Sequence, residues 1–570
     1  AEVWSQDRGR IVAAADSALA RLRAAAGVRG GGGAALSRTV LDRAYSQVAS
    51  SYDERYGGFG GAPKFPRPAT PDFLLRHHAA SGRPEALEMV LHTLRAMAAG
   101  GIHDPIGGGF HRYAVDERWH VPHFEKMLYD QAQLACTYLD AYQITHDAPY
   151  AEVVRDILDY VRRDLTGAEG QFLSAEDADS ALPGQPEAHA EGAFYVWTWR
   201  ELAECLGDGA AEVVGFRFGA APGGNVREDP QGEFQGRNVL FVAHSLDETA
   251  ARFNRPVEDI RGLLAAARDA LRAQRGKRPR PHLDDKAITA WNGLMISAYA
   301  RAFQVLGDEA YLSAARAAAG AVRERLYDEQ RGVLRRCYRG SEAAIDGYLD
   351  DYAFLIRGLL DLYEASFDAA CLTWAIGLQS RQDELFRDPA DGGYFSTTGA
   401  DPSVLLRMKN AYDGAEPSPN SIAVMNLLRL GLMTDDPRYR DRAEQTLSAF
   451  AETLSRAPHA MPQMAAAVEW LLSRPRRVLI AGDPDQDDTR RLLRVVHERF
   501  LPNKVVLLAD GGEHQAALSG HIPAMASAER LDGHATAYVC DDRGCSLPTT
   551  APDRLAALLE TVPGGDEAMR

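Results

Sequence analysis

The residues best suited to chemistry in this 570-residue chain are densest between Asp104 and Leu134. This stretch, DPIGGGFHRYAVDERWHVPHFEKMLYDQAQL, combines three glycines and three histidines with mixed charges and aromatic rings. Glycines let a backbone approach a ligand closely, and rings beside charges suit a polar ligand with apolar faces. A well hydrogen-bonded connection between helices is the alternative. The candidate site residues here are Phe110, His111, Arg112, His123, Glu125, Lys126 and Tyr129.

Acid-rich clusters recur further along the chain, between the expected helices. They supply the remaining candidates, which are Asp177, Asp179, Trp197, His282, Asp285, Trp291, Asn292, Asp351, Tyr352, Asp413, Glu416 and Asn420. Each cluster alone is typical of a helix N-cap, because Asp and Ser satisfy the free N–H groups there. Several such clusters beside Trp and Tyr favour a sugar site, in which rings stack on the sugar while acids bind hydroxyls or transfer protons.

The sequence gives little support to a metal or a cofactor. His120 and His123 could ligate a metal, but Pro122 prevents them from sharing one helical turn, and we expect His123 near the start of a helix with Glu125 in its first turn. Cys540 and Cys545 flank a hairpin turn as a weak metal pair or a redox pair, without the second pair that zinc needs. No phosphate-binding loop or nucleophile elbow occurs. We expect no metal and no cofactor.

Composition excludes several classes of function. The net charge of −17 disfavours a nucleic-acid partner, which clustered Lys and Arg would have to hold. Six scattered cysteines argue against a secreted disulfide framework and favour a reducing, cytoplasmic setting. No apolar run approaches the roughly 20 residues that cross a bilayer, and the charged amphipathic start lacks the pattern of a signal peptide. The chain opens on Ala rather than Met, and its oligomeric state stays open.

The pattern of apolar residues predicts the elements that must position these candidates. A helix over residues 1–28 leads to a Gly30–Gly33 hinge, after which helices alternate with glycine-rich aromatic turns up to residue 472. The turns share a short phrase, as in Gly108-Gly109-Phe110 and Gly392-Gly393-Tyr394, with a longer gap that holds a local elaboration from Gly223 to Phe241. About six periods of two helices predict a closed ring of helix pairs. The helices are expected over 41–50, 71–80, 84–99, 124–145, 150–165, 199–206, 257–275, 288–306, 309–326, 348–366, 370–385, 421–433, 437–454 and 460–472.

The pattern changes after residue 475. Apolar β-like runs at 477–481 and 504–509 enclose a helix at 487–500, which is the spacing of a βαβ unit. A third strand at 535–540 and a helix at 551–560 complete a small α/β part, and the tail 563–570 is expected to be disordered. The predicted organisation is therefore an N-terminal helix and hinge (1–33), a helical ring (34–474) and a C-terminal α/β subdomain (475–570).

Several long phrases make the chain resemble a known family. GGFGGAPKFP, SAEDADS, GAFYVWTW, DDKAITAWNG, YLDDYAFL and YDGAEPSPNS, together with the stretch from Asp104 to Leu134, are similar to the spermatogenesis-associated protein 20 and YyaL family over nearly the whole chain. The resemblance implies a mainly α protein, an (α/α)6 toroid of the six-hairpin glycosidase type, similar to N-acylglucosamine 2-epimerase. Family members usually begin with a thioredoxin-like domain. No motif of such a domain occurs in this sequence, so we expect that the sequence is truncated or that the thioredoxin-like part is absent or is a separate partner.

These features together predict a carbohydrate-active enzyme that epimerises or isomerises a sugar or sugar derivative at the ring mouth. His111 or His123 opposite His282 would supply the acid and base, and Arg112 with Lys126 would hold an anionic substituent. A glycoside hydrolase with paired carboxylates is the second hypothesis. The third is a non-catalytic ligand-binding or scaffold protein that works with a thioredoxin-like partner.

Overall fold

The structure, a computed structural model, describes residues 4, 6–26, 36–182, 184–226, 232–340, 342–343, 345–401 and 403–560. The predicted Gly30–Gly33 hinge and the tail at 563–570 lie outside these residues. The helices are α2 (Arg8–Ala26), α3 (Arg38–Ala49), α4 (Ala69–Ser81), α5 (Pro84–Ala99), α6 (Leu128–Thr145), α7 (Ala148–Asp164), α8 (Trp199–Leu206), α9 (Asp208–Phe218), α10 (Leu246–Phe253), α11 (Val257–Arg275), α12 (Thr289–Leu306), α13 (Glu309–Leu326), α14 (Leu349–Ser366), α15 (Ala369–Phe386), α16 (Pro419–Thr434), α17 (Pro437–Arg456), α18 (Pro462–Leu472), α19 (Asp487–His497), α20 (Glu513–Leu518), α21 (Pro523–Ala526) and α22 (Pro552–Glu560).

Short strands join these helices. They are β1 (Tyr113–Ala114), β2 (Pro122–His123), β3 (Lys126–Met127), β4 (Ala175–Glu176), β5 (Asp179–Leu182), β6 (Gln185–Glu191), β7 (Leu283–Asp284), β8 (Ala287–Ile288), β9 (Tyr327–Asp328), β10 (Val333–Leu334), β11 (Cys337–Arg339), β12 (Glu342–Ala343), β13 (Arg476–Ala481), β14 (Lys504–Ala509), β15 (Thr536–Asp541) and β16 (Gly544–Cys545). No helix in the described part of the chain is both long and apolar enough to cross a membrane.

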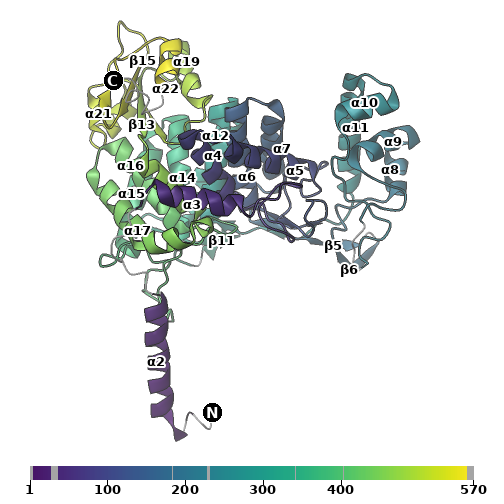
Figure 1. The fold of residues 1–570 in the computed structure, drawn as a ribbon, viewed down its shortest axis with the longest axis horizontal. Helices are drawn as coiled ribbons and strands as arrows, with labels where there is room; N and C mark the ends of the chain where they lie inside the picture. The colour runs from purple at the N-terminus through teal and green to yellow at the C-terminus, as the bar shows by residue number, and fades with distance from the viewer. Residues whose placement is uncertain are drawn as a thin grey trace.

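Twelve of the described helices form a closed ring in two layers (Figure 1). The inner layer runs α4, α6, α12, α14, α16 and α18, each packed on the next, and α18 closes the circle against α4. The outer helices α5, α7, α13, α15 and α17 each follow an inner helix, and α3 covers α18 and α4. The predicted (α/α)6 toroid is therefore the observed architecture.

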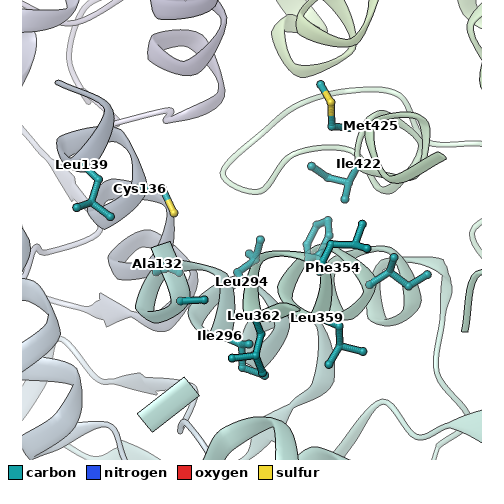
Figure 2. Packing of buried hydrophobic residues seen from close by; sticks show 14 of the residues in the cluster. Ala132, Cys136, Leu139, Leu294, Ile296, Phe354, Leu359, Leu362, Ile422 and Met425 are labelled. Carbon is teal, nitrogen blue, oxygen red and sulfur yellow. The ribbon is translucent and has the colours of Figure 1, made fainter. Parts of the chain in front are cut away.

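The inner helices are buried on nearly every side, as their sequences require. A helix that is apolar on most sides must lie inside a protein, and twelve of the 18 residues of α12 (TAWNGLMISAYARAFQVL) are buried, from Thr289 to Ala302. The tightest packing joins α12 to α14, where a side chain at Gly293 would collide with the backbone of Phe354 and one at Gly358 with the carbonyl of Gly293. Apolar side chains from α6, α12, α14 and α16 fill the space between these helices (Figure 2).

Side-chain amides anchor the recurring glycine-aromatic turns to the inner helices. Asn292 on α12 accepts the N–H of Phe172 at 2.8 Å and donates to its carbonyl at 2.9 Å. Asn420 on α16 does the same with Tyr394 at 2.8 and 2.9 Å. On α6 the longer Gln131 clamps the turn through both backbone groups of its aromatic residue, at 2.8 and 2.7 Å. In each of these three turns, one side-chain amide at the start of an inner helix thus binds both backbone groups of the aromatic residue.

A helical insertion leaves the ring between α7 and α12. It contains the hairpin β5–β6 and helices α8 to α11, has apolar clusters of its own, and lies to one side of the ring in Figure 1. The predicted elaboration from Gly223 to Phe241 is only part of it. Helices α9 and α10 were not predicted, although Ser245 and Glu248 form a capping box at the start of α10 that the sequence displays.

The C-terminal part packs over the ring as a four-stranded sheet in the order β14-β13-β15-β16. Strands β13 and β14 are parallel and joined through α19, which confirms the predicted βαβ unit, and β15 runs antiparallel to β13. Its apolar residues belong to the same buried cluster as the ring. The domain boundaries proposed above stay a prediction, with β13 starting at Arg476.

Candidate active site at the ring mouth

The ring mouth, the end at which α6, α12, α14 and α16 begin, carries two buried carboxyl groups. Glu416 precedes α16, and Asp130 lies in the first turn of α6. Within the described residues, Oε1 of Glu416 and Oδ2 of Asp130 are buried without a hydrogen-bond partner. Burial is the main cause that raises the pKa of Glu416 to about 7 and the pKa of Asp130 well above its ordinary value. The charge of Glu416 raises the pKa of Asp130 further, so the two groups interact.

Aromatic and amide side chains surround this carboxyl pair. Tyr129 of α6 and Trp291 of α12 meet edge to face with ring centroids 5.0 Å apart. The charge of Glu416 raises the pKa of Tyr129, and a hydrogen bond from Trp291 lowers the pKa of Glu416. Gln133 of α6 donates to the carbonyl of Ala415 at 2.9 Å and so fixes the loop that presents Glu416. The two carboxyls are therefore held from two different helices against a shared pair of rings.

A chain of charges extends from the carboxyl pair to His123. Arg112, whose charge lowers the pKa of Asp130, binds Glu125 at 2.8 Å. The His123 ring lies 2.7 Å from Glu191 and 3.6 Å from Glu125. Hydrogen bonds to Glu125 and Glu191 raise the pKa of His123 to about 9. At neutral pH this imidazole is a cation that can donate a proton and cannot accept one.

The expected helix start at residues 123–125 is wrong. Residues 122–123 form β2, paired with β1, and Lys126–Met127 form β3, paired with β4, so that α6 begins only at Leu128. Glu125 consequently lies in the link between two strands. Its carboxylate pairs with Arg112 and His123 and does not lie in the first turn of α6, where it would interact with the helix dipole.

Two exposed tyrosines stand on the loops that enter the mouth. Tyr348 is 38% exposed just before α14, where Arg336 lies 4.9 Å over its ring. Tyr412 is 57% exposed in the loop that leads to Glu416. Arg336 also binds Asp350 at 2.9 Å, and Asp350 is one of the charges that raise the pKa of Glu416. These rings are accessible to a ligand, unlike most of the aromatics proposed from the sequence.

Three aromatic residues predicted to bind substrate lie in the core instead. Phe110, Trp197 and Tyr352 are each fully buried. Trp197 packs under Arg278 in the insertion, and the Tyr352 hydroxyl accepts the N–H of Leu334 at 2.9 Å. Rings without solvent access cannot stack on a sugar, so their role in this structure is packing.

Four polar residues that the sequence places in the site form hydrogen bonds to the backbone instead. The amides of Asn292 and Asn420 are occupied by the turn clamps described above. Asp351 accepts backbone N–H groups at 2.8 and 3.1 Å and pairs with Arg336, and Asp413 accepts two backbone N–H groups at 2.7 and 2.8 Å. Burial raises the pKa of Asp413 to about 7, but its two acceptor bonds hold the starts of α16 and α18 together.

His111 and Lys126 belong to a buried network beside the insertion. Lys126 binds Asp104 at 2.9 Å, and Arg275 of α11 binds the same carboxylate at 2.8 Å. Burial holds the pKa of His111 well below its ordinary value, and its Nδ1 lies 2.9 Å from the carbonyl of Phe124. These groups tie the loop before α6 to the insertion and do not reach the ring mouth.

The remaining candidates are exposed and do not contact the carboxyl pair in the described structure. Asp177 and Asp179 lie next to β4 and β5, and the N–H of Asp177 donates to the carbonyl of His282 at 2.9 Å. Asp285 forms an ion pair with Arg339. No contact among the imidazoles of His111, His123 and His282 is observed in the described residues, so their pairing stays a prediction.

Asp130 is the residue that the sequence reasoning missed. An acid in the first turn of a helix is ordinarily explained by the helix dipole. A stronger signal was available, since α6 is apolar on the faces around it and a carboxyl there must be buried. A buried carboxyl without a partner is costly and points to function.

Cys540 and Cys545 form a disulfide across the hairpin of β15 and β16. This corrects the expectation of a weak metal pair, and the redox alternative stays a prediction. Among the described residues, no group of three His, Cys, Asp or Glu side chains is arranged to hold a metal ion.

Comparison with known proteins places the chain among relatives. No protein-family model matches it. Spermatogenesis-associated protein 20 of Homo sapiens is 44% identical over 545 residues, which cover 91% of this chain and 69% of the human protein. The chain belongs to the spermatogenesis-associated protein 20 family. The family name states no activity, so the chemistry has to come from the site.

Solved structures with a similar arrangement of helices include two carbohydrate enzymes. The cellobiose 2-epimerase of Bacillus thermoamylovorans is 10% identical with a TM-score of 0.45, over 73% of this chain and 88% of that one. A family 76 α-mannanase of Bacteroides thetaiotaomicron is 11% identical with a TM-score of 0.43, over 76% of this chain and 94% of that one. Such low scores carry no argument about chemistry in this member of the family.

Proposed function

We propose that the protein is an enzyme that transfers protons to and from a sugar or sugar derivative at the ring mouth, with Glu416 and Asp130 as the acid and base. The observation that carries this proposal is a pair of interacting carboxyl groups, each with one buried oxygen that has no hydrogen-bond partner among the described residues. A ligand hydroxyl that displaces the covering side chains would supply the missing hydrogen-bond partners of these buried oxygens. Trp291, Tyr348 and Tyr412 would offer apolar ring faces to the sugar.

The two carboxyls differ in a way that suits acid and base roles. Asp130, whose pKa burial raises well above its ordinary value, holds its proton more tightly than an exposed carboxyl and can donate it to a leaving oxygen. Glu416, with a pKa of about 7, is partly ionised and can activate water or attack an anomeric carbon. This division favours hydrolysis of a glycosidic bond.

Epimerisation or isomerisation is the second candidate, and His123 favours it. With a pKa of about 9 this imidazolium can protonate an enolate oxygen while the Glu416 carboxylate removes the proton from the neighbouring carbon. Arg112, between Glu125 and the carboxyl pair, would hold an anionic substituent such as a uronic carboxylate.

The experiment is a paired assay on the full chain. Release of 4-nitrophenol from a panel of 4-nitrophenyl glycosides and uronides measures hydrolysis, and loss of the C2 proton signal in D2O measures epimerisation of reducing sugars. Glu416→Gln and Asp130→Asn should each lower kcat by about 100-fold or more. Glu452→Gln, an exposed residue of α17, is the matched control and should leave kcat unchanged.

The outcomes separate the candidates. Nitrophenol release that depends on both carboxyls supports hydrolysis, and proton exchange that depends on Glu416 and His123 supports epimerisation. Activity that survives both carboxyl variants would refute the assignment of Glu416 and Asp130. Saturable sugar binding without turnover in either assay would refute catalysis and favour a binding protein.

A further inference from the structure

A polar cavity lies inside the ring, on the side covered by the C-terminal part. It measures about 110 Å³ and lies among the C-terminal halves of α6 and α12, residues 357–364 of α14 and residues 422–429 of α16, with a floor supplied by residues 497–504 of the C-terminal part. Asp140 lines it from α6, ten residues beyond Asp130, which places the two sites about 15 Å apart along that helix. Buried apolar side chains of the same helices, such as Cys136 and Leu294, pack between them (Figure 2).

Cationic side chains converge on this cavity from several directions. Arg301 of α12 pairs with Asp140. Arg429 of α16 binds Asp361 at 2.8 Å and Glu364 at 2.7 Å, both on α14. Two further cations reach it with partners of their own: Lys504, 3.8 Å from Glu364, and Arg76, 3.1 Å from Asp72. Each of these positive charges therefore has a carboxylate within ion-pair distance.

Arg357 of α14 is different. It lines the same cavity but forms no hydrogen bond or ion pair with any described residue, although Asp72 and Asp361 are close enough for its charge to lower their pKa values. A guanidinium has five donor hydrogens that burial leaves costly unless they are paired. The cavity thus holds one positive charge in excess of its ion pairs.

Other polar atoms around the cavity also lack partners. Nδ1 of His497, a residue 7% exposed at the floor, is buried without a hydrogen bond among the described residues. Burial beside Lys504 lowers the pKa of His497 to about 3, so the ring is neutral and one of its nitrogens carries a donor hydrogen. Arg357 from the ring and His497 from the floor therefore line a common cavity.

We propose that this cavity binds a small tetrahedral oxyanion, inorganic phosphate or sulfate, held by Arg357 and bridged to His497. A guanidinium fork matches two oxygens of such an ion, which a spherical halide cannot offer. The cavity has room for an ion and a little water, since each water occupies about 30 Å³ of liquid. The bound ion would connect the ring to the C-terminal part, which already meets it through hydrogen bonds of 2.6 and 3.2 Å from Gln143 to backbone carbonyls.

Isothermal titration calorimetry on the full chain, at constant ionic strength, tests the proposal. Inorganic phosphate and sulfate should bind saturably at one site, chloride should not compete, and glycerol 3-phosphate should bind more weakly because of its size. Arg357→Gln should raise the Kd for phosphate at least tenfold. Arg316→Gln, an exposed arginine of α13 without an ion pair in the described structure, is the matched control and should keep the wild-type Kd.

A second measurement keeps the test decisive if a variant is unstable. On going from anion-free buffer to saturating phosphate, the wild type should gain more Tm than Arg357→Gln. Absence of phosphate binding in the wild type, or equal binding by Arg357→Gln, would overturn the proposal. Tighter binding of glycerol 3-phosphate than of phosphate would overturn the assignment of a free inorganic ion.

Discussion

The raised pKa of Glu416 predicts how the stability of the protein depends on pH. The ordinary carboxyl value of 4.5 applies in the unfolded chain, and the folded value is about 7. Between these two values the folded state holds a proton that the unfolded state has released, so the free energy of unfolding falls as pH rises through this window. At 1.36 kcal/mol per pH unit, the loss is about 3 kcal/mol.

Glu416→Gln should abolish this loss, because an amide of the same shape does not ionise. The free energy of unfolding, measured by denaturant titration from pH 4 to pH 8, should be similar for wild type and variant at pH 4. By pH 8 the variant should be more stable by about 3 kcal/mol. Other buried acids, such as Asp130 and Asp413, titrate in both proteins and mostly cancel in the difference.

The control for this experiment is Glu452→Gln. Glu452 is exposed on α17 in an i,i+4 pair with Arg456, so its difference from wild type should stay within about 0.5 kcal/mol at every pH. Parallel curves for wild type and Glu416→Gln across pH 4.5–7 would refute the reasoning, because they would mean that Glu416 ionises as easily in the folded state as in the unfolded one.

Three further outcomes follow from the structure. Asn292→Ala leaves both backbone groups of Phe172 without partners in the core and should lower the free energy of unfolding by about 2 to 5 kcal/mol in denaturant titration; a loss below 1 kcal/mol would contradict the clamp. Asp104→Asn leaves the buried Lys126 charge poorly compensated and should lower the free energy of unfolding by about 3 to 5 kcal/mol in the same assay. An unchanged free energy of unfolding would mean that water, rather than Asp104, compensates the Lys126 charge. His123 should titrate near pH 9 by NMR. Its contribution to the free energy of unfolding should be complete below pH 6.5 and should disappear as pH rises through 9. A midpoint near 6.5 would mean that Glu125 and Glu191 do not stabilise the charged imidazole.

The helices of the ring follow from local sequence. Apolar runs without interruption, as in α12 and α14, can be stable only when buried, and the glycine-aromatic turns between them mark where each helix ends. The pattern therefore located the ring helices to within a few residues and gave their pairing. The same local rules located β13, α19 and β14, because strand and helix periods differ.

Local rules failed where tertiary pairing decided the structure. The segment before α6 resembles a helix start, but residues 122–123 and 126–127 form strands because β1 and β4 lie beside them. Helix α9, with two glycines in eleven residues, has a weak propensity and is held by the apolar cluster of the insertion. Strand β4 lies about 50 residues beyond β3, so no short window of the chain contains that pairing.

The sequence by itself determined that acids, rings and arginines gather at helix starts, and it named Glu416, Arg112 and Trp291 among them. Only the tertiary structure decided which of these groups meet. Asn292 and Asp351 form hydrogen bonds to the backbone. Asp130 looks like an ordinary acid at a helix start, but its Oδ2 is buried without a hydrogen-bond partner among the described residues. The physical reason is that a pKa and a free hydrogen-bonding atom depend on burial and on neighbours from other helices, and both are set when the ring closes.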